Sequence, residues 1–111
     1  MAKTVYLGMI GDIMHPGYIN IINKAAEYGD VMVGLFTDKA IANHRRLPYL
    51  TWDQRKTVVE SIAKVSKVVP QDDWSYIPNL LEYKPDYIIH GDDWQYGPEK
   101  YLRDAVYQIM E

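Results

Sequence analysis

Cysteine is absent from this 111-residue chain, phenylalanine occurs only once, and no apolar run is long. Without cysteine the chain has no disulfide framework, no thiolate metal site and no cysteine nucleophile. No apolar stretch approaches the roughly 18 residues that a membrane-spanning helix needs. The first residues lead straight into a strand-like run and show no signal peptide. We therefore expect a soluble cytoplasmic protein.

An excess of positive charge is also missing, because the formal net charge is −3 at pH 7. This balance argues against a general surface for nucleic acid or anionic membranes, although a local basic cluster can still bind phosphates. The length suits one domain with a real core. Tyrosine, in contrast, is plentiful, with ten residues beside three tryptophans. Such rings are typical of half-buried positions in clefts or at subunit contacts.

Apolar, β-branched runs alternate with amphipathic segments along the chain. This alternation, with nearly continuous apolar runs in the strands, indicates an α/β fold with a parallel sheet and right-handed crossovers. Thr51 and Gln54 have the spacing of a capping box, and Gly29 is a suitable helix stop. The expected strands are 4–10, 31–36, 67–69 and 87–89; the expected helices begin after Pro16, after Thr51, at Trp74 and at Gly97, and 40–50 is expected to be a basic loop.

Three unusual loops follow the carboxyl ends of expected strands. They begin at Gly11, Asp38 and Gly91. In open parallel sheets ligands bind beyond these ends, near the point where the strand order reverses. The shared edge therefore predicts a single binding site.

The first of these loops, residues 11–18, has the composition of an anion site. It leads into a helix whose first N–H groups are unpaired and lie at the positive end of the helix dipole, where phosphates bind. The spacing matches neither the dinucleotide fingerprint nor a P-loop. His15 could donate to a phosphate oxygen, Gly17 lets a ligand approach the backbone, and Asp12 could hold Mg²⁺ or orient the substrate. The alternative is a turn aspartate and a helix-capping histidine.

The second loop is basic and contains His44, Arg45 and Arg46. Arg45 is a candidate to reach across the phosphates, and the alternative is an ordinary solvated loop. Arg55, in the helix that follows, either touches a ligand or makes a structural salt bridge, for which Asp38 is a candidate partner. The histidines of the chain lack the spacing of a metal site.

The third loop contains the Gly-Asp-Asp-Trp sequence of residues 91–94. The glycine permits close approach to a planar group, and one of the carboxylates can accept a hydrogen bond from an exocyclic amine. The indole of Trp94 can stack or bind a cationic head group. The alternative is an ordinary loop.

These motifs occur together in one family. With Asp12-x-x-His15-x-Gly17 after the first strand, arginines up to Arg55 and the 91–94 sequence, the chain resembles the cytidylyltransferase-like nucleotidyltransferases. These include the glycerol-3-phosphate, choline-phosphate and ethanolamine-phosphate cytidylyltransferases. Segment 35–55 is similar to the nucleotidyltransferase domains attached to phosphoenolpyruvate phosphomutases in phosphonate biosynthesis. The resemblance implies a Rossmann-like three-layer α/β/α sandwich that occupies residues 1–111 as one domain.

The resemblance also implies a reaction. A phosphate or phosphonate oxygen attacks the α-phosphorus of CTP in the presence of Mg²⁺, and pyrophosphate leaves. It implicates His15 and Gly17 in binding the CTP phosphates, Arg45 in stabilising the transition state, and Gly91, Asp92 and Asp93 in holding cytosine and ribose. From the loops themselves we also expect Tyr18 to act in catalysis and Gly11, Asp12 and Arg55 to bind the nucleotide, with Asp12 on the metal. Trp94 and Trp74, which are near these loops in the sequence, are expected to contact the acceptor.

The chain departs from the family pattern in two places. Tyr18 stands where the family has a second histidine, and a phenol can donate a hydrogen bond but carries no positive charge. The chain ends at Glu111, before the Arg-Thr-x-Gly-Ile-Ser-Thr segment that grips the β and γ phosphates in the family. We therefore expect a C-terminally short domain with reduced activity, and a truncated chain, a fragment of a larger phosphomutase-fused protein and a degenerate relative stay open.

Two other functions also stay open: an adenylyltransferase that uses ATP, and a nucleotide-binding or assembly module without turnover. Because family members commonly pair close to their active-site loops, we expect a homodimer.

Overall fold

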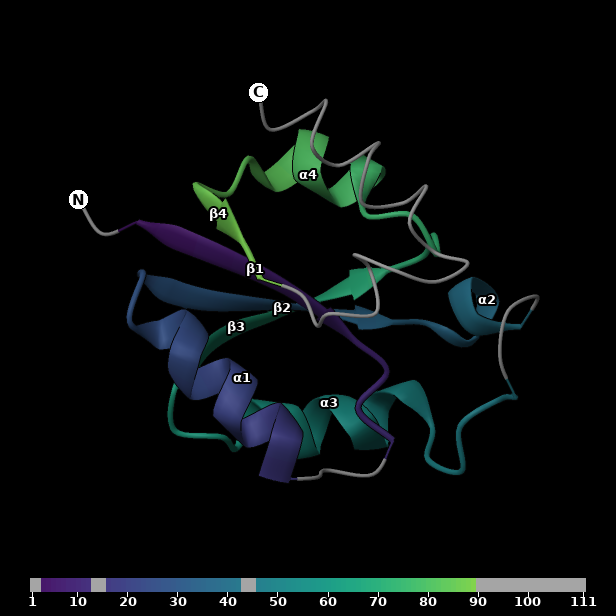
Figure 1. The fold of residues 1–111 in the computed structure, drawn as a ribbon. Helices are drawn as coiled ribbons and strands as arrows, with labels where there is room; N and C mark the ends of the chain where they lie inside the picture. The colour runs from purple at the N-terminus through teal and green to yellow at the C-terminus, as the bar shows by residue number, and fades with distance from the viewer. Residues whose placement is uncertain (1–2, 13–15, 43–45, 90–111) are drawn as a thin grey trace.

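The structure, a computed structural model, describes residues 3–12, 16–42 and 46–89 (Figure 1). Strands and helices alternate along most of this part of the chain. The strands are β1 (Thr4–Met9), β2 (Asp30–Phe36), β3 (Val65–Gln71) and β4 (Tyr87–Ile88). The helices are α1 (Pro16–Ala26), α2 (Asp38–Ile41), α3 (Trp52–Glu60) and α4 (Ile77–Tyr83).

The strands of the described sheet are all parallel and lie in the order β3-β2-β1-β4. From β1 the chain proceeds outward through β2 to β3, and it then returns to the other side of β1 as β4. The strand order therefore reverses between β1 and β4, which is where open α/β sheets bind ligands. The parallel sheet predicted from the apolar runs is confirmed.

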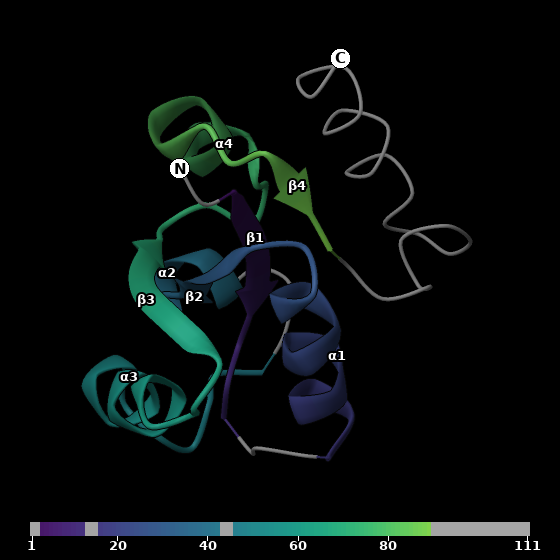
Figure 2. The same ribbon diagram turned by 90° about the vertical axis from the view of Figure 1, so that its left-hand side faces the viewer.

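Helices cover both faces of this sheet. Figure 2 shows α1 and α3 on one face and α4 on the opposite face. Because successive side chains of a strand point to opposite faces, Val5 and Leu7 of β1 pack with Ile22 and Val59 of α1 and α3, whereas Tyr6 packs on the α4 side. The chain thus forms a three-layer α/β/α sandwich with one hydrophobic core on each side of the sheet.

Several boundaries differ from those expected from the sequence. The short helix α2 lies where the basic loop was expected to begin, because the side chain of Thr37 accepts the N–H of Ala40 and caps a helical turn. Strand β3 continues through Pro70 instead of ending before it, since a proline is tolerated in a strand at the edge of the described sheet. Helix α4 begins at Ile77 and not at Trp74, which places Pro78 in the first turn.

Other local expectations are confirmed. The side chains of Thr51 and Gln54 form the predicted capping box at the start of α3. The last predicted helix, after Gly97, lies outside the described residues. Within the described ranges, no helix has the length and apolar character needed to cross a bilayer.

Candidate active site

Three segments meet at the carboxyl edge of the sheet: the loop after β1, the start of α2 after β2, and residues 46–51 before α3 (Figure 1). The guanidinium of Arg55, a fully buried side chain of α3, joins them. Its Nη1 donates to the carbonyls of Ile10 and Phe36, both at 2.7 Å. Its Nε donates to the carbonyl of Leu50 at 3.3 Å, and its Nη2 donates to Asp38 at 3.0 Å.

These contacts engage four of the five N–H donors of the Arg55 guanidinium. Burial lowers the pKa of Arg55, and the half-exposed carboxylate of Asp38 opposes that shift. The salt bridge with Asp38, one of the two roles considered for this residue, is therefore present. A contact between Arg55 and a nucleotide stays a prediction.

Asp12 follows the end of β1 and reaches the segment before α3. Its Oδ2 accepts the N–H of Tyr49 and its Oδ1 accepts the N–H of Leu50, each at 3.0 Å. These two hydrogen bonds, with smaller contributions from the positive charges of Arg46 and Arg55, hold the pKa of the Asp12 carboxyl below its usual value. The carboxylate therefore ties the loop after β1 to residues 49 and 50.

Gly11 turns the chain out of β1. Its φ of +69° lies in the left-handed region, which glycine adopts without steric cost. A Cβ at this position would lie 2.9 Å from Leu35 Cδ1 and 3.2 Å from Val59 Cγ2. The fold thus requires glycine here, and contact of Gly11 with a nucleotide stays a prediction.

The N-terminus of α1 carries Gly17 and Tyr18. No acidic residue lies in the first turn, so no side-chain charge there opposes the positive end of the helix dipole. Tyr18 is partly buried and packs against the core between α1 and the sheet. Binding of an anion by this first turn stays a prediction, and Tyr18 is positioned by packing.

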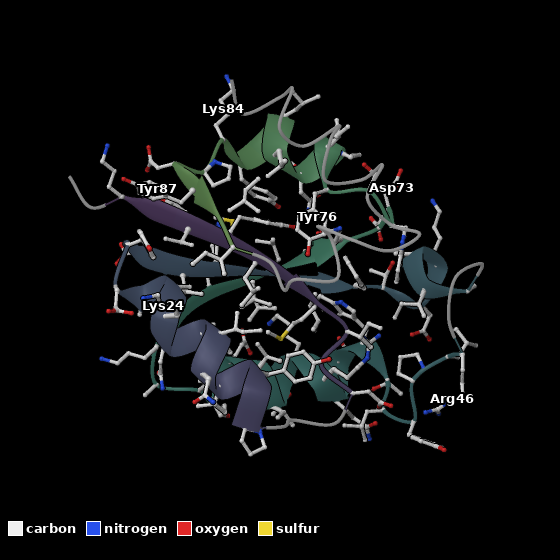
Figure 3. The ribbon with its side chains drawn as sticks, viewed as in Figure 1. Lys24, Arg46, Asp73, Tyr76, Lys84 and Tyr87 are labelled. Atoms are coloured by element: carbon white, nitrogen blue, oxygen red, sulfur yellow. The ribbon has the colours of Figure 1, made fainter. Side chains whose placement is uncertain are left out.

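Arg46 and Tyr49 form an exposed pair in the segment before α3. The guanidinium of Arg46 lies 4.3 Å from the centre of the Tyr49 ring, a cation–π distance. Figure 3 shows Arg46 beyond the carboxyl ends of β1 and β2. The sequence predicts Arg45 as the cation of this loop and predicts no role for Tyr49.

Trp74 lies in the core on the α4 side and is only 9% exposed. Its ring centre is 5.1 Å from that of Phe36, the last residue of β2. Little of the ring is left for an acceptor to contact, and acceptor binding by Trp74 stays a prediction.

A buried polar network lies on the same side of the sheet and was not anticipated from the sequence. The hydroxyl of Tyr6 donates to Gln71, and Asn79 donates to that hydroxyl at 2.8 Å and to the carbonyl of Pro70 at 3.0 Å. Gln71 donates to the carbonyl of Asp73 at 3.1 Å. Burial raises the pKa of Tyr6 far above its usual value. The network joins β1, β3 and α4 to the loop that carries Asp73, which Figure 3 shows near Tyr76.

The remaining predicted site residues lie outside the described part of the chain. They are His15, Arg45, Gly91, Asp92, Asp93 and Trp94. Of the predicted set, the structure brings Asp12 and Arg55 together through Leu50, and it places Gly17 and Tyr18 at the start of the helix that follows the Asp12 loop.

Comparison with known proteins finds relatives that share most of this chain. The glycerol-3-phosphate cytidylyltransferase of Bacillus subtilis is 28% identical over 106 residues, which cover 94% of this chain and 81% of the relative. The enzyme of the same name from Staphylococcus aureus is 33% identical, over 84% of this chain and 71% of the relative. The FAD synthase of Archaeoglobus fulgidus is 32% identical, over 86% of this chain and 69% of the relative.

The fold has a counterpart among solved structures. The lipopolysaccharide core biosynthesis protein from Thermoplasma volcanium superposes with a TM-score of 0.83 over 98% of this chain and 89% of that protein, at 21% identity. The sequence profile of the family described as cytidylyltransferase-like matches residues 11–109. This chain therefore belongs to the cytidylyltransferase-like family.

Proposed function

We propose that this protein is a cytidylyltransferase that transfers CMP from CTP to a small phosphonate or phospho-alcohol and releases pyrophosphate. The main support is the family match over residues 11–109. The first turn of α1 carries no acidic residue, and α1 follows β1, the strand beside which the strand order reverses. Relatives named for transfer to glycerol 3-phosphate and to ethanolamine phosphate support a small phosphorylated acceptor.

In the proposed reaction an acceptor oxygen bonds to the α-phosphorus of CTP while the bond from that phosphorus to the α–β bridging oxygen breaks. Pyrophosphate leaves with that oxygen. Such transfers depend on positioning and on neutralisation of charge, more than on covalent help from the protein. The N–H groups at the start of α1, His15 and Arg45 would hold the phosphates, and Tyr18 would act as a neutral donor.

Mg²⁺ bound to the nucleotide would neutralise charge on its phosphates. Each carboxylate oxygen of Asp12 already accepts a backbone N–H, so a magnesium ion bound there would share these oxygens with the loop. Among the residues described, no three His, Asp or Glu side chains gather where they could hold a metal ion. We propose that the metal arrives with the nucleotide.

Release of pyrophosphate from CTP tests the proposal. The acceptors to compare are glycerol 3-phosphate, phosphocholine, aminoethylphosphonate and hydroxyethylphosphonate, each with CTP and with ATP. Turnover with CTP and at least one acceptor is the expected result. A lack of turnover with every one of these acceptors would contradict the proposal.

A phosphonate is the acceptor that we propose first, because segment 35–55 resembles the nucleotidyltransferase domains attached to phosphoenolpyruvate phosphomutases. If the acceptor is cationic, the indole of Trp94 would attract it by a cation–π contact of about 0.5–2 kcal/mol. Trp94→Ala should then weaken the binding of aminoethylphosphonate more than the binding of hydroxyethylphosphonate. An equal loss for the two acceptors would contradict the cation–π contact.

Adenylyl transfer is a second candidate, because FAD synthases, named for a product that contains adenine, are among the similar proteins. A thermal-shift comparison of CTP with ATP separates the two: the preferred nucleotide raises the unfolding temperature more at equal concentration. We expect CTP to do so, because the Gly-Asp-Asp-Trp sequence of residues 91–94 favours cytosine.

A module without turnover is a third candidate, motivated by Tyr18 in place of a histidine. Tyr18→His should raise the transfer rate, because imidazolium adds a positive charge at the start of α1. A lower rate in this variant would mean that the tyrosine suits the natural acceptor.

A further inference from the structure

Leu50 is held from both sides by charged residues of other elements. Its N–H donates to Asp12 Oδ1 at 3.0 Å, and its carbonyl accepts from Arg55 Nε at 3.3 Å. The preceding N–H, that of Tyr49, donates to Asp12 Oδ2 at 3.0 Å. Two consecutive N–H groups and one carbonyl of residues 49–50 are therefore fixed against the loop after β1 and against α3.

The Asp12 carboxylate uses both of its oxygens in this contact. A carboxylate that accepts backbone N–H groups makes charge-assisted hydrogen bonds, which are stronger than neutral ones. A metal ion at this carboxylate would share its oxygens with the two N–H groups. Among the described residues no three His, Asp or Glu side chains gather to complete a cation site, so the geometry favours attachment of the loop.

The attached segment carries an arginine toward the carboxyl edge of the sheet. Arg46 stacks on the ring of Tyr49 at 4.3 Å, and the backbone of Tyr49 is the group that Asp12 holds. Tyr49 itself is 76% exposed, so its own side chain has little packing to keep it in place. The position of the Arg46 guanidinium therefore depends on the Asp12 hydrogen bonds.

We propose that Asp12 is a positioning residue, which clamps residues 49–50 so that the Arg46–Tyr49 pair faces the phosphates, and that it is not a magnesium ligand. This inference rests on the proposed nucleotidyl transfer for its effect on rate, whereas the clamp itself can be measured without any turnover.

The clamp is tested by amide hydrogen exchange, measured by NMR on the full chain. In Asp12→Ala the amides of Tyr49 and Leu50 should exchange about tenfold faster, the loss expected for one hydrogen bond of this kind. Amides in β2 should keep their protection, which controls for general unfolding. Asp12→Asn offers only one acceptor oxygen and should give an intermediate result. Asp53→Asn, a carboxylate removed from the first turn of α3, is the matched control and should leave both amides unchanged.

The consequence for turnover is tested with the same variants. Asp12→Ala should lower kcat by about ten- to a hundredfold through misplacement of Arg46, with the Mg²⁺ concentration for half-maximal activity unchanged. If Asp12 acts through Arg46, the Asp12→Ala/Arg46→Ala double variant should be no slower than the slower single variant.

Two results would overturn the inference. The clamp is wrong if exchange of the Tyr49 and Leu50 amides is unchanged in Asp12→Ala. A role at the metal is indicated instead if the variant needs at least about tenfold more Mg²⁺ for half-maximal activity, the scale on which changes around a metal site alter its affinity. If the unmodified protein transfers no nucleotide to any acceptor, the proposed function fails, and the exchange measurement still decides on the clamp.

Discussion

Arg55 shows at the scale of one residue how a buried charge can organise a site. Its guanidinium has no solvent exposure, yet it meets the carbonyls at the ends of β1 and β2 and a carboxylate that is itself 58% exposed. A planar fork of donors suits these divergent acceptors, and a lysine ammonium does not. Arg55 therefore matters first to the geometry of the carboxyl edge.

Arg55→Ala should destabilise the fold by about 3 kcal/mol or more, because it leaves two strand-end carbonyls and Asp38 without their donor. Arg55→Lys should recover only part of the loss. Urea unfolding at equilibrium measures both. The neighbouring Lys56→Ala, which removes only an exposed pair with Glu60, should cost less than about 1 kcal/mol. An Arg55→Ala variant as stable as Lys56→Ala would show that the hydrogen bonds of Arg55 do not stabilise the fold by more than burial of its charge costs.

The Asp12 carboxyl predicts a dependence of stability on acid pH. Its folded-state pKa is lowered, first by the N–H of Tyr49, from a usual value of 3.8. The stabilisation is therefore fully present above that value and is lost as the pH falls through the lower, folded-state pKa. The difference in unfolding temperature between the unmodified protein and Asp12→Ala should be constant near neutral pH and shrink in strong acid. A constant difference for Asp12→Ala down to strong acid would contradict the prediction.

Among the elements, the two central strands show how glycines create room for buried hydroxyls. Gly8 of β1 lies opposite Gly34 of β2 in the register. A Cβ at Gly34 would collide with the hydroxyl of Tyr6, and one at Gly8 would collide with that of Tyr76. The hydroxyl of Tyr6 in turn holds Gln71 at the end of β3. The two glycines thus leave room on the α4 face of the sheet for the hydroxyls of Tyr6 and Tyr76.

Gly34→Ala should destabilise the protein by about 1–3 kcal/mol, the usual cost of overpacking a core. Tyr6→Phe removes the hydroxyl that the new methyl group would meet. The double variant should therefore lose less stability than the sum of the two single variants, as measured by thermal unfolding. Strict additivity would show that the methyl group is accommodated elsewhere.

For the whole molecule, the exposed apolar side chains near the site bear on assembly. Leu47 and Tyr49 are 51% and 76% exposed in the segment before α3. Large exposed side chains that lie together are typical of protein contacts. The family resemblance implies pairing close to the active-site loops, so we expect a homodimer.

Light scattering at micromolar concentration should give the mass of a dimer. Leu47→Ser combined with Tyr49→Ser should shift the population toward monomer. Leu81→Ser, which changes a similarly exposed leucine on α4, should not. A monomer mass for the unmodified protein would contradict the prediction.

Much of the architecture could be predicted because it depends on local pattern. Continuous apolar runs separated by amphipathic segments specify parallel strands with helical crossovers, and the Thr51–Gln54 spacing specifies a cap. The boundaries at Pro70 and Ile77 were less predictable. A proline is tolerated in a strand that lies at the edge of a sheet and in the first turn of a helix. Whether β3 lies at an edge is a property of the assembled sheet.

The fold class and the family follow from the amino-acid sequence alone, because both depend on patterns and motifs that lie within short segments. The contacts of Asp12 and Arg55, in contrast, depend on the tertiary structure. Asp12 meets a backbone group 38 residues away, and Arg55 meets one 45 residues away. A carboxylate or guanidinium has the same chemistry for a loop as for a nucleotide, so its partner depends on which backbone groups the packed sheet and helices bring within hydrogen-bond distance.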